Sequence, residues 1–167
     1  MTKVNLLKEL KSFTEMSIRD LLLPVRMQKN DNNQPPPRAA DVYMMRLVKS
    51  SDAQKAAPYI IHQVITGKDA QASGKLAEGS AVVRSIFCVY NEDEQEGALA
   101  LLGLMERLRI DLLETTVIAK QYELVKDGDG LEMLIYPDDS RPYYAGEMIG
   151  TWSMPGVQRK VDLFNGL

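Results

Sequence analysis

The residues of this chain whose types and spacing could do chemistry are the carboxylates of one short acidic run, Glu92, Asp93, Glu94 and Glu96. Carboxylate oxygens bind Ca²⁺ and Mg²⁺, so the run would be a cation site if its ligands converged. A calcium loop places its acidic ligands at alternate positions and closes with a distant Glu, and this run has neither feature. The sequence therefore favours a helix start, in which Asn91 or Asp93 caps the first turn and the following glutamates interact with its positive end.

The single histidine and the single cysteine lie within apolar segments, at His62 and Cys88. A zinc site needs several His or Cys ligands, and the chain has one residue of each kind. The chain also lacks the G-x-S-x-G sequence of hydrolases and the G-x-x-x-x-G-K-[ST] sequence of phosphate-binding loops. We expect His62 to be a hydrogen-bonded strand residue and Cys88 a small core residue. We predict neither an enzyme nor a cofactor or metal site.

Composition and length indicate one soluble globular domain. The 167 residues suffice for a hydrophobic core, and a content of 45% hydrophobic and 26% charged residues is ordinary. The net charge of -3 argues weakly against a nucleic-acid-binding surface, which needs clustered Lys and Arg. We expect no signal peptide and no membrane span, since no apolar run approaches the roughly 18 residues required. A single cysteine cannot form an internal disulfide, which favours a reducing compartment.

Two segments have helical periodicity. Apolar residues at helical spacing predict one helix or two short ones over residues 3–22, ending before Pro24 and covering either their own sheet or a neighbour's. The principal helix is expected over residues 97–113, with Gly97 in its first turn, where low helix propensity costs least. At about 100° per residue, one broad face of this helix is predicted to pack on the sheet. Its members are Ala98, Leu101, Leu102, Leu104, Met105, Leu108 and Leu112.

Six segments rich in β-branched and aromatic residues predict strands, at residues 42–48, 59–66, 81–90, 122–125, 131–136 and 147–154. The longest, 81–90, is expected to lie centrally and to be covered on both faces. Two hairpins are expected: the polar connection before Pro58 would join the first two strands, and the Asp-Gly at 127–128 would join the fourth and fifth. Residues 67–80 are expected to form a long loop, and residues 137–140 a turn.

The expected fold is therefore α+β: a mixed, mainly antiparallel sheet packed by one principal helix, plus an N-terminal helix and extended arms. We divide the chain into an N-terminal helix with a proline-rich linker or arm (1–38), an α+β core domain (39–157) and a C-terminal tail (158–167). Residues 28–38 include three consecutive prolines and form either a solvated linker or an arm that reaches a neighbouring subunit.

The principal helix carries a second apolar stripe, roughly opposite the face that packs on the sheet. Leu99, Gly103, Glu106 and Ile110 lie on this side, and the glycine leaves room for another backbone to approach. They are either boundary positions or a contact between subunits, worth about 1.5–3 kcal/mol per fully buried large side chain. More apolar helix surface than one core needs, without a catalytic motif, favours a protein that functions by assembling.

Aromatic residues gather near the end of the chain, at Tyr143, Tyr144 and Trp152. Tyr and Trp are frequent anchors of protein interfaces. They are equally suited to a core, in which Trp152 would close the helix-facing side of the sheet. The sequence leaves both interpretations open, and the three residues are candidates for a subunit interface.

Several of these segments share a recognisable order. A strand, an acidic turn and a helix follow one another in IFCVYNEDEQEGALALLGLMERLRIDLL. YELV and LEMLIYPDD come next, and then RPYYAGEMIGTWSMP, with a Pro-aromatic-x-Gly element and a Trp-x-Met-Pro ending. Upstream, Pro58-Tyr59-Ile60-Ile61 enters a strand. In this order, residues 42–157 resemble the tail-terminator and tail-completion proteins of tailed bacteriophages.

The resemblance implies an α+β subunit that forms a ring, commonly a hexamer, which caps the tail tube and stops its polymerisation. The ring would also join the tail to the head connector or stopper protein of the virion, after assembly in the host cytoplasm. DNA would pass through the lumen without specific contacts. Glu92, Asp93 and Glu94 are candidate lumen-facing residues, because acidic groups repel phosphate. A closed ring needs heterologous contacts, for which the stripe of Leu99 and Ile110 and the terminal arms are candidates.

Two alternatives stay open. Another neck component, such as a head-completion or stopper protein, would share the size and the assembly principle. A soluble α+β protein that binds a small ligand would instead be a monomer or dimer with one deep pocket.

Overall fold

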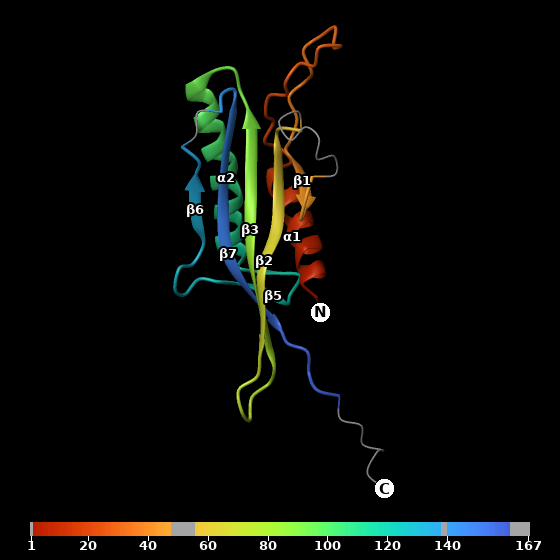
Figure 1. Ribbon diagram of the computed structural model, residues 1–167, viewed down its shortest axis with the longest axis vertical. Helices are drawn as coiled ribbons and strands as arrows, with labels where there is room; N and C mark the ends of the chain where they lie inside the picture. The colour runs from red at the N-terminus through yellow and green to blue at the C-terminus, as the bar shows by residue number, and fades with distance from the viewer. Residues whose placement is uncertain (1, 48–55, 138–139, 161–167) are drawn as a thin grey trace.

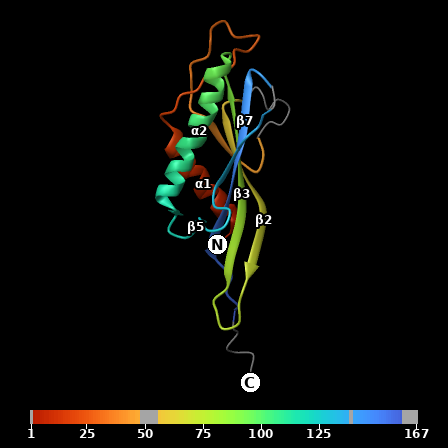
Figure 2. The same ribbon diagram turned by 90° about the vertical axis from the view of Figure 1, so that its left-hand side faces the viewer.

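A computed structural model of the chain describes residues 2–47, 56–137 and 140–160 (Figure 1). A seven-stranded sheet has the strand order β1-β2-β3-β7-β5-β4, with β6 also pairing with β7. Both helices lie on one face of this sheet (Figure 2). Among the described strands, β1 and β2 are parallel and the other pairs are antiparallel. The predicted α+β class with a mixed, mainly antiparallel sheet is confirmed.

Helix α1 spans Lys3–Ile18 and packs on β1 and β2 of its own sheet. Thr2 caps it by accepting a hydrogen bond from the backbone N–H of Asn5. The predicted end at residue 22 was four residues too late. Leu23 instead exchanges two backbone hydrogen bonds with Arg38, at 2.8 and 3.0 Å, which draws the chain out of the helix. This pairing brings together the two ends of the loop formed by residues 24–37.

Helix α2 spans Glu94–Thr115, longer at both ends than predicted. Asp93 is its N-cap and accepts from the backbone N–H of Glu96, as the sequence favoured. The helix packs on β3 and β7. Five predicted core residues are buried: Leu101, Leu104, Met105, Leu108 and Leu112. Ala98 and Leu102 were assigned to this face wrongly, because they lie at its margin and are exposed.

Strands β1 (Asp41–Met44) and β2 (Tyr59–Ala70) are parallel neighbours, so the hairpin predicted between them was wrong. Asp41 aligns with Tyr59, which means that the connection returns to the starting end of β1. At Met45 the backbone turns with φ 63°, and Arg46 N–H bonds back to the carbonyl of Met44 at 2.7 Å. Residues 48–55 of the connection lie outside the described residues, and residue 48 is the last residue of the predicted strand 42–48.

Strand β3 spans Glu78–Tyr90 and forms a long hairpin with β2. Residues 67–80, predicted as a loop, pair across the strands from Gly67 with Ala81 to Ala70 with Glu78, and the loop is confined to residues 71–77. Backbone pairing extends these strands although their side chains are exposed. β3 is central, as predicted, between β2 and β7. Its helix-facing side is buried, while the other side is half-buried until Cys88.

Strand β7 (Tyr143–Pro155) is long enough to pair with two strands in succession. β5 (Tyr122–Val125) lies beside its end and β6 (Glu132–Ile135) beside its middle. The hairpin predicted between β5 and β6 was therefore wrong. The two strands follow one another along the same β7 strand, and residues 126–131 connect them. The two-residue strand β4 (Val117–Ile118) was not predicted. The turn predicted at 137–140 contains residues outside those described.

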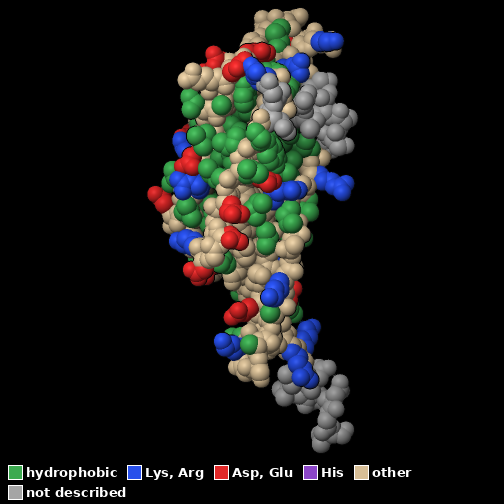
Figure 3. All heavy atoms as spheres, turned by 60° about the vertical axis from the view of Figure 1, so that its left-hand side comes forward, with side chains coloured by type: hydrophobic (Ala, Val, Ile, Leu, Met, Phe, Trp, Pro, Cys, Tyr) green, Lys and Arg blue, Asp and Glu red, His purple; other side chains and the backbone are tan. Residues whose placement is uncertain are grey.

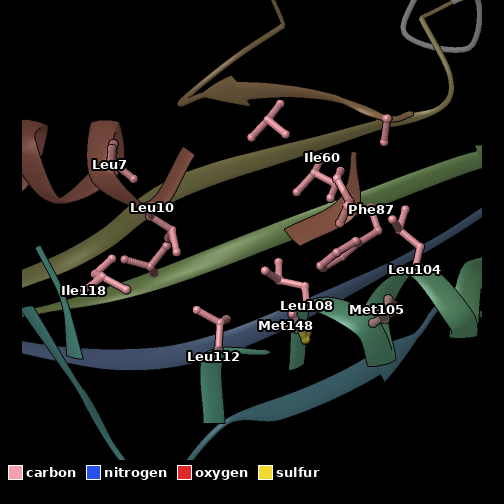
Figure 4. Close-up of a cluster of buried hydrophobic side chains, with 14 of the residues drawn as sticks. Leu7, Leu10, Ile60, Phe87, Leu104, Met105, Leu108, Leu112, Ile118 and Met148 are labelled. Atoms are coloured by element: carbon pink, nitrogen blue, oxygen red, sulfur yellow. The ribbon is translucent and has the colours of Figure 1, made fainter. Parts of the chain in front are cut away.

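The principal core lies between the helices and the sheet (Figure 4). Leu7 and Leu10 of α1, Phe87 of β3 and Leu104 and Leu108 of α2 belong to this one cluster. The N-terminal helix thus shares the core of the sheet that follows it. On the opposite face a smaller cluster contains Ala57, Tyr59, Ile61, Cys88, Tyr90 and Tyr143.

Two extensions leave this body at opposite ends (Figure 1). Residues 24–37 extend from one end, where Arg26 donates a 2.6 Å hydrogen bond to the hydroxyl of Tyr143 and lies over its ring. The β2–β3 hairpin extends from the other end. The start of the C-terminal tail runs beside it, because Gln158 and Gly156 bond to the backbone of Ala77. Residues 161–167 of the predicted tail lie outside the described part.

Candidate interaction surfaces

The second stripe of α2 lies on the side of the helix away from the sheet. Leu99 is 54% exposed and Ile110 44% exposed. A Cβ added to Gly103 would meet no atom within 4 Å, so the surface around it is open. On the same side of the helix, between Leu99 and Ile110 in the sequence, Glu106 accepts two hydrogen bonds from Arg109, at 2.7 and 2.9 Å. These bonds hold both long side chains along the helix. The stripe therefore presents two exposed apolar side chains and an open glycine beside an ion pair within the helix.

The three aromatic candidates for an interface lie in the interior instead. Trp152 is 2% exposed and belongs to the principal core, so it closes the helix-facing side of the sheet. Tyr143 is buried in the smaller cluster, and its ring centroid lies 5.6 Å from that of Tyr90, with the two ring planes tilted by 53°. Tyr144 is half-buried and its ring contacts Gly97 at the start of α2. Their assignment as interface residues was wrong for Trp152 and Tyr143, because neighbouring strands and helices already bury them.

The acidic turn does not gather its carboxylates into a site. Glu92 accepts a hydrogen bond from the hydroxyl of Tyr90, and Asp93 caps α2. Glu94 pairs with Arg141. Each carboxylate thus interacts with a different neighbour. Across the residues that the structure describes, no group of three or more His, Cys, Asp or Glu side chains could hold a metal ion.

His62 joins α1 to the sheet through a buried hydrogen-bond chain. The hydroxyl of Thr14 donates to the carbonyl of Leu10 at 2.7 Å, so its oxygen accepts from His62 Nε2 at 2.9 Å. Nδ1 is then unprotonated and accepts from Ser85 Oγ at 2.7 Å. Burial lowers the pKa of His62 to about 3, so the imidazole is neutral. The predicted hydrogen-bonded strand histidine is confirmed.

Cys88 is buried between Tyr59 and Tyr90 in the smaller cluster. Burial raises the pKa of its thiol to about 11, which keeps the sulfur protonated at neutral pH. A protonated and inaccessible thiol is a poor nucleophile. Cys88 is thus a core residue, as the sequence predicted.

A groove with a volume of about 700 Å³ lies between α1 and β1. Ile18 and Val42 belong to its apolar lining, and charged side chains from both elements surround it. These are Lys11, Glu15, Arg19, Asp41 and Arg46. This groove was not predicted, because the expected hairpin between β1 and β2 does not place β1 beside α1 at the edge of the sheet. The polar and charged residues around β1 were the feature of the sequence that could have indicated an exposed edge strand beside a groove.

At the opposite side of the sheet, β6 forms an edge with exposed apolar side chains. Leu134 and Ile135 are both exposed although they belong to a strand. Met105 of α2 lies behind this edge, since a Cβ at Gly146 would approach both its sulfur and the carbonyl of Leu134. Figure 3 shows hydrophobic side chains gathered over the upper half of the face that carries α2 and β6. Exposed apolar patches of this kind often mark sites of association.

No protein-family model matches this chain, and no curated protein sequence is significantly similar to it. Within the described residues, neither helix combines the length and apolar character that crossing a membrane requires.

Proposed function

We propose that this protein is a structural subunit that assembles into a ring, and that the ring is a tail terminator of a tailed bacteriophage. The observation that carries the proposal is the exposed stripe of Leu99, Gly103 and Ile110, on the side of α2 that its own sheet leaves uncovered. Burying the apolar part of this stripe against a second subunit would stabilise the assembly by about 25 cal/mol for each Å² of apolar surface removed from water.

The ring, most simply a hexamer, would cap the tail tube, stop its polymerisation and join it to the head connector or stopper protein. The protein would assemble in the host cytoplasm and remain in the virion at the neck. DNA would pass through the lumen without specific contacts. Glu92, Asp93 and Glu94 are exposed at one end of the molecule and would repel its phosphates if they lined that lumen.

Solution mass is the first test of the assembly. Sedimentation velocity and native mass spectrometry at rising protein concentration should show a closed oligomer of fixed size. A protein that stays monomeric at high concentration and does not bind tail tubes would contradict the proposal.

Tail length separates a terminator from another neck component. Negative-stain images of tails assembled without this protein should show overlong tubes. Tubes of normal length would contradict a terminator and favour a head-completion or stopper protein.

A small-ligand-binding protein is the second candidate, and the groove of about 700 Å³ between α1 and β1 is the observation that favours it. This alternative predicts a monomer or dimer whose thermal stability rises with the correct small molecule. A fixed-size ring without such a response would exclude it.

A further inference from the structure

We propose that the β6 edge of one copy of this chain docks against the free β1 edge of a second copy, beside the groove between α1 and β1. The inference rests on the proposed ring and adds to it a second contact between neighbouring subunits. It concerns sheet edges, which are distinct from the stripe on α2.

Both edges have unpaired backbone groups. β1 and β6 are each four residues long, and no described strand pairs with the outer side of either. An edge strand presents a row of N–H and C=O groups to which another chain can add a strand. The groove beside β1 leaves room next to this edge for side chains of the added strand.

The strand directions allow the two edges to pair. β1 runs parallel to β2, and antiparallel pairing alternates from β2 through β3 and β7 to β6. β1 and β6 therefore run in opposite directions within one subunit. A second copy rotated about an axis along the strands would place its β6 antiparallel to β1.

The charges of the two edges are complementary. Near β1, Glu15 pairs with Lys11 and Asp41 pairs with Arg38, whereas Arg19 and Arg46 pair with no described carboxylate. The β6 side carries three exposed carboxylates, Asp127, Asp129 and Glu132, and one exposed cation, Lys126, so its net charge is negative. A basic edge would thus face an acidic one, which favours docking between copies in one orientation.

Apolar side chains are exposed beside these charges on both edges. Met44 and Met45 are exposed at the end of β1, and Leu134 and Ile135 are exposed on β6. Met adapts its shape to irregular contacts, so the two pairs can pack without an exact fit. Because the two surfaces differ, the contact is heterologous, and its repetition closes a ring or continues as a filament.

Cysteine cross-linking tests which surfaces meet. Met44→Cys and Leu134→Cys place one thiol on each edge, while the buried Cys88 stays unchanged. A short bismaleimide should link a mixture of the two variants into dimers and should link neither variant by itself. Leu76→Cys, at an exposed position of the hairpin loop, is the matched control and should not link to either. Equal linking of the control, or linking of one variant to itself, would overturn the proposal.

A charge exchange provides the second test. Arg46→Glu and Glu132→Arg should each weaken subunit association about tenfold in sedimentation equilibrium, and the double variant should restore it. Failure of the double variant to recover would overturn the pairing of these edges. Rings that form without the specific cross-link would refute this contact while leaving the proposed assembly intact. A protein that stays monomeric throughout would refute both.

Discussion

The ring of Tyr144 in β7 lies directly against Gly97 in the first turn of α2. A Cβ at position 97 would approach Cε2 of Tyr144 to 2.2 Å, so only glycine fits between the helix and the strand. The first turn of a helix tolerates a glycine, because low helix propensity costs least there. The structure adds a reason, which is the close approach of α2 to β7.

We expect Gly97→Ala to destabilise the protein, because the gain in helix propensity is smaller than the overpacking cost of about 1–3 kcal/mol. In the unassembled subunit, Gly103→Ala is the matched control in the same helix, since its Cβ would be in open space there. That variant should stabilise the fold by about 0.5–1 kcal/mol. Urea unfolding of both variants measures the difference, and an equally stable Gly97→Ala would contradict the contact.

The folded-state stability should fall in mild acid because of His62. Its pKa is lowered from 6.5 to about 3 in the folded protein, so the unfolded chain takes up a proton first. The contribution of His62 to the free energy of unfolding is fully present above pH 6.5. It decreases by about 1.4 kcal/mol per pH unit as the pH falls toward 3. His62→Gln should remove this slope between pH 6.5 and 5, since the chain contains one histidine. Denaturant unfolding at several pH values checks it, and parallel slopes for both proteins would refute it.

We expect Thr14→Val to cost about 1–3 kcal/mol, because the nearly isosteric valine leaves the Nε2–H of His62 buried without an acceptor. Ser12→Ala, at an exposed position of the same helix, should change stability by less than about 0.5 kcal/mol. Thermal unfolding compares the two variants. Equal losses would indicate that the histidine chain does not hold α1 to the sheet.

Asp93 should contribute to stability through its cap and not through its charge. Asp93→Ala should cost about 1 kcal/mol, whereas Asp93→Asn keeps a side-chain oxygen for the N–H of Glu96 and should cost much less. Urea unfolding measures both. If the two variants lose the same stability, the charge at the helix start matters more than the hydrogen bond.

Leu99→Asp and Ile110→Asp should leave the fold intact and abolish ring formation. Both side chains are substantially exposed, so a carboxylate there stays in water in the monomer but would be buried at a subunit contact. Circular dichroism should be unchanged while sedimentation velocity shows monomers. Leu76→Asp, on the hairpin loop, is the control that should still assemble. Rings of normal size from both stripe variants would remove the stripe from the contact.

The sequence by itself determined the local elements and most of their buried faces. The period of the apolar residues predicted both helices, and five of seven residues on the sheet-facing side of α2 are buried as expected. The acidic turn was correctly assigned to a helix start, since capping depends on residues a few positions apart. His62 and Cys88 were correctly assigned to the interior, because each lies in an apolar segment.

Only the tertiary structure decided which strands are neighbours and which surfaces stay open. The Asp-Gly turn predicted a hairpin between β5 and β6, but each of these strands pairs with the long β7 instead. β1 became a parallel edge strand beside α1, and Trp152 became core. Strand pairing and burial depend on contacts between residues far apart in the chain, whereas helix caps and periodicity depend on near neighbours. The candidate docking edges therefore follow from the fold, while the stripe on α2 could already be predicted from the sequence.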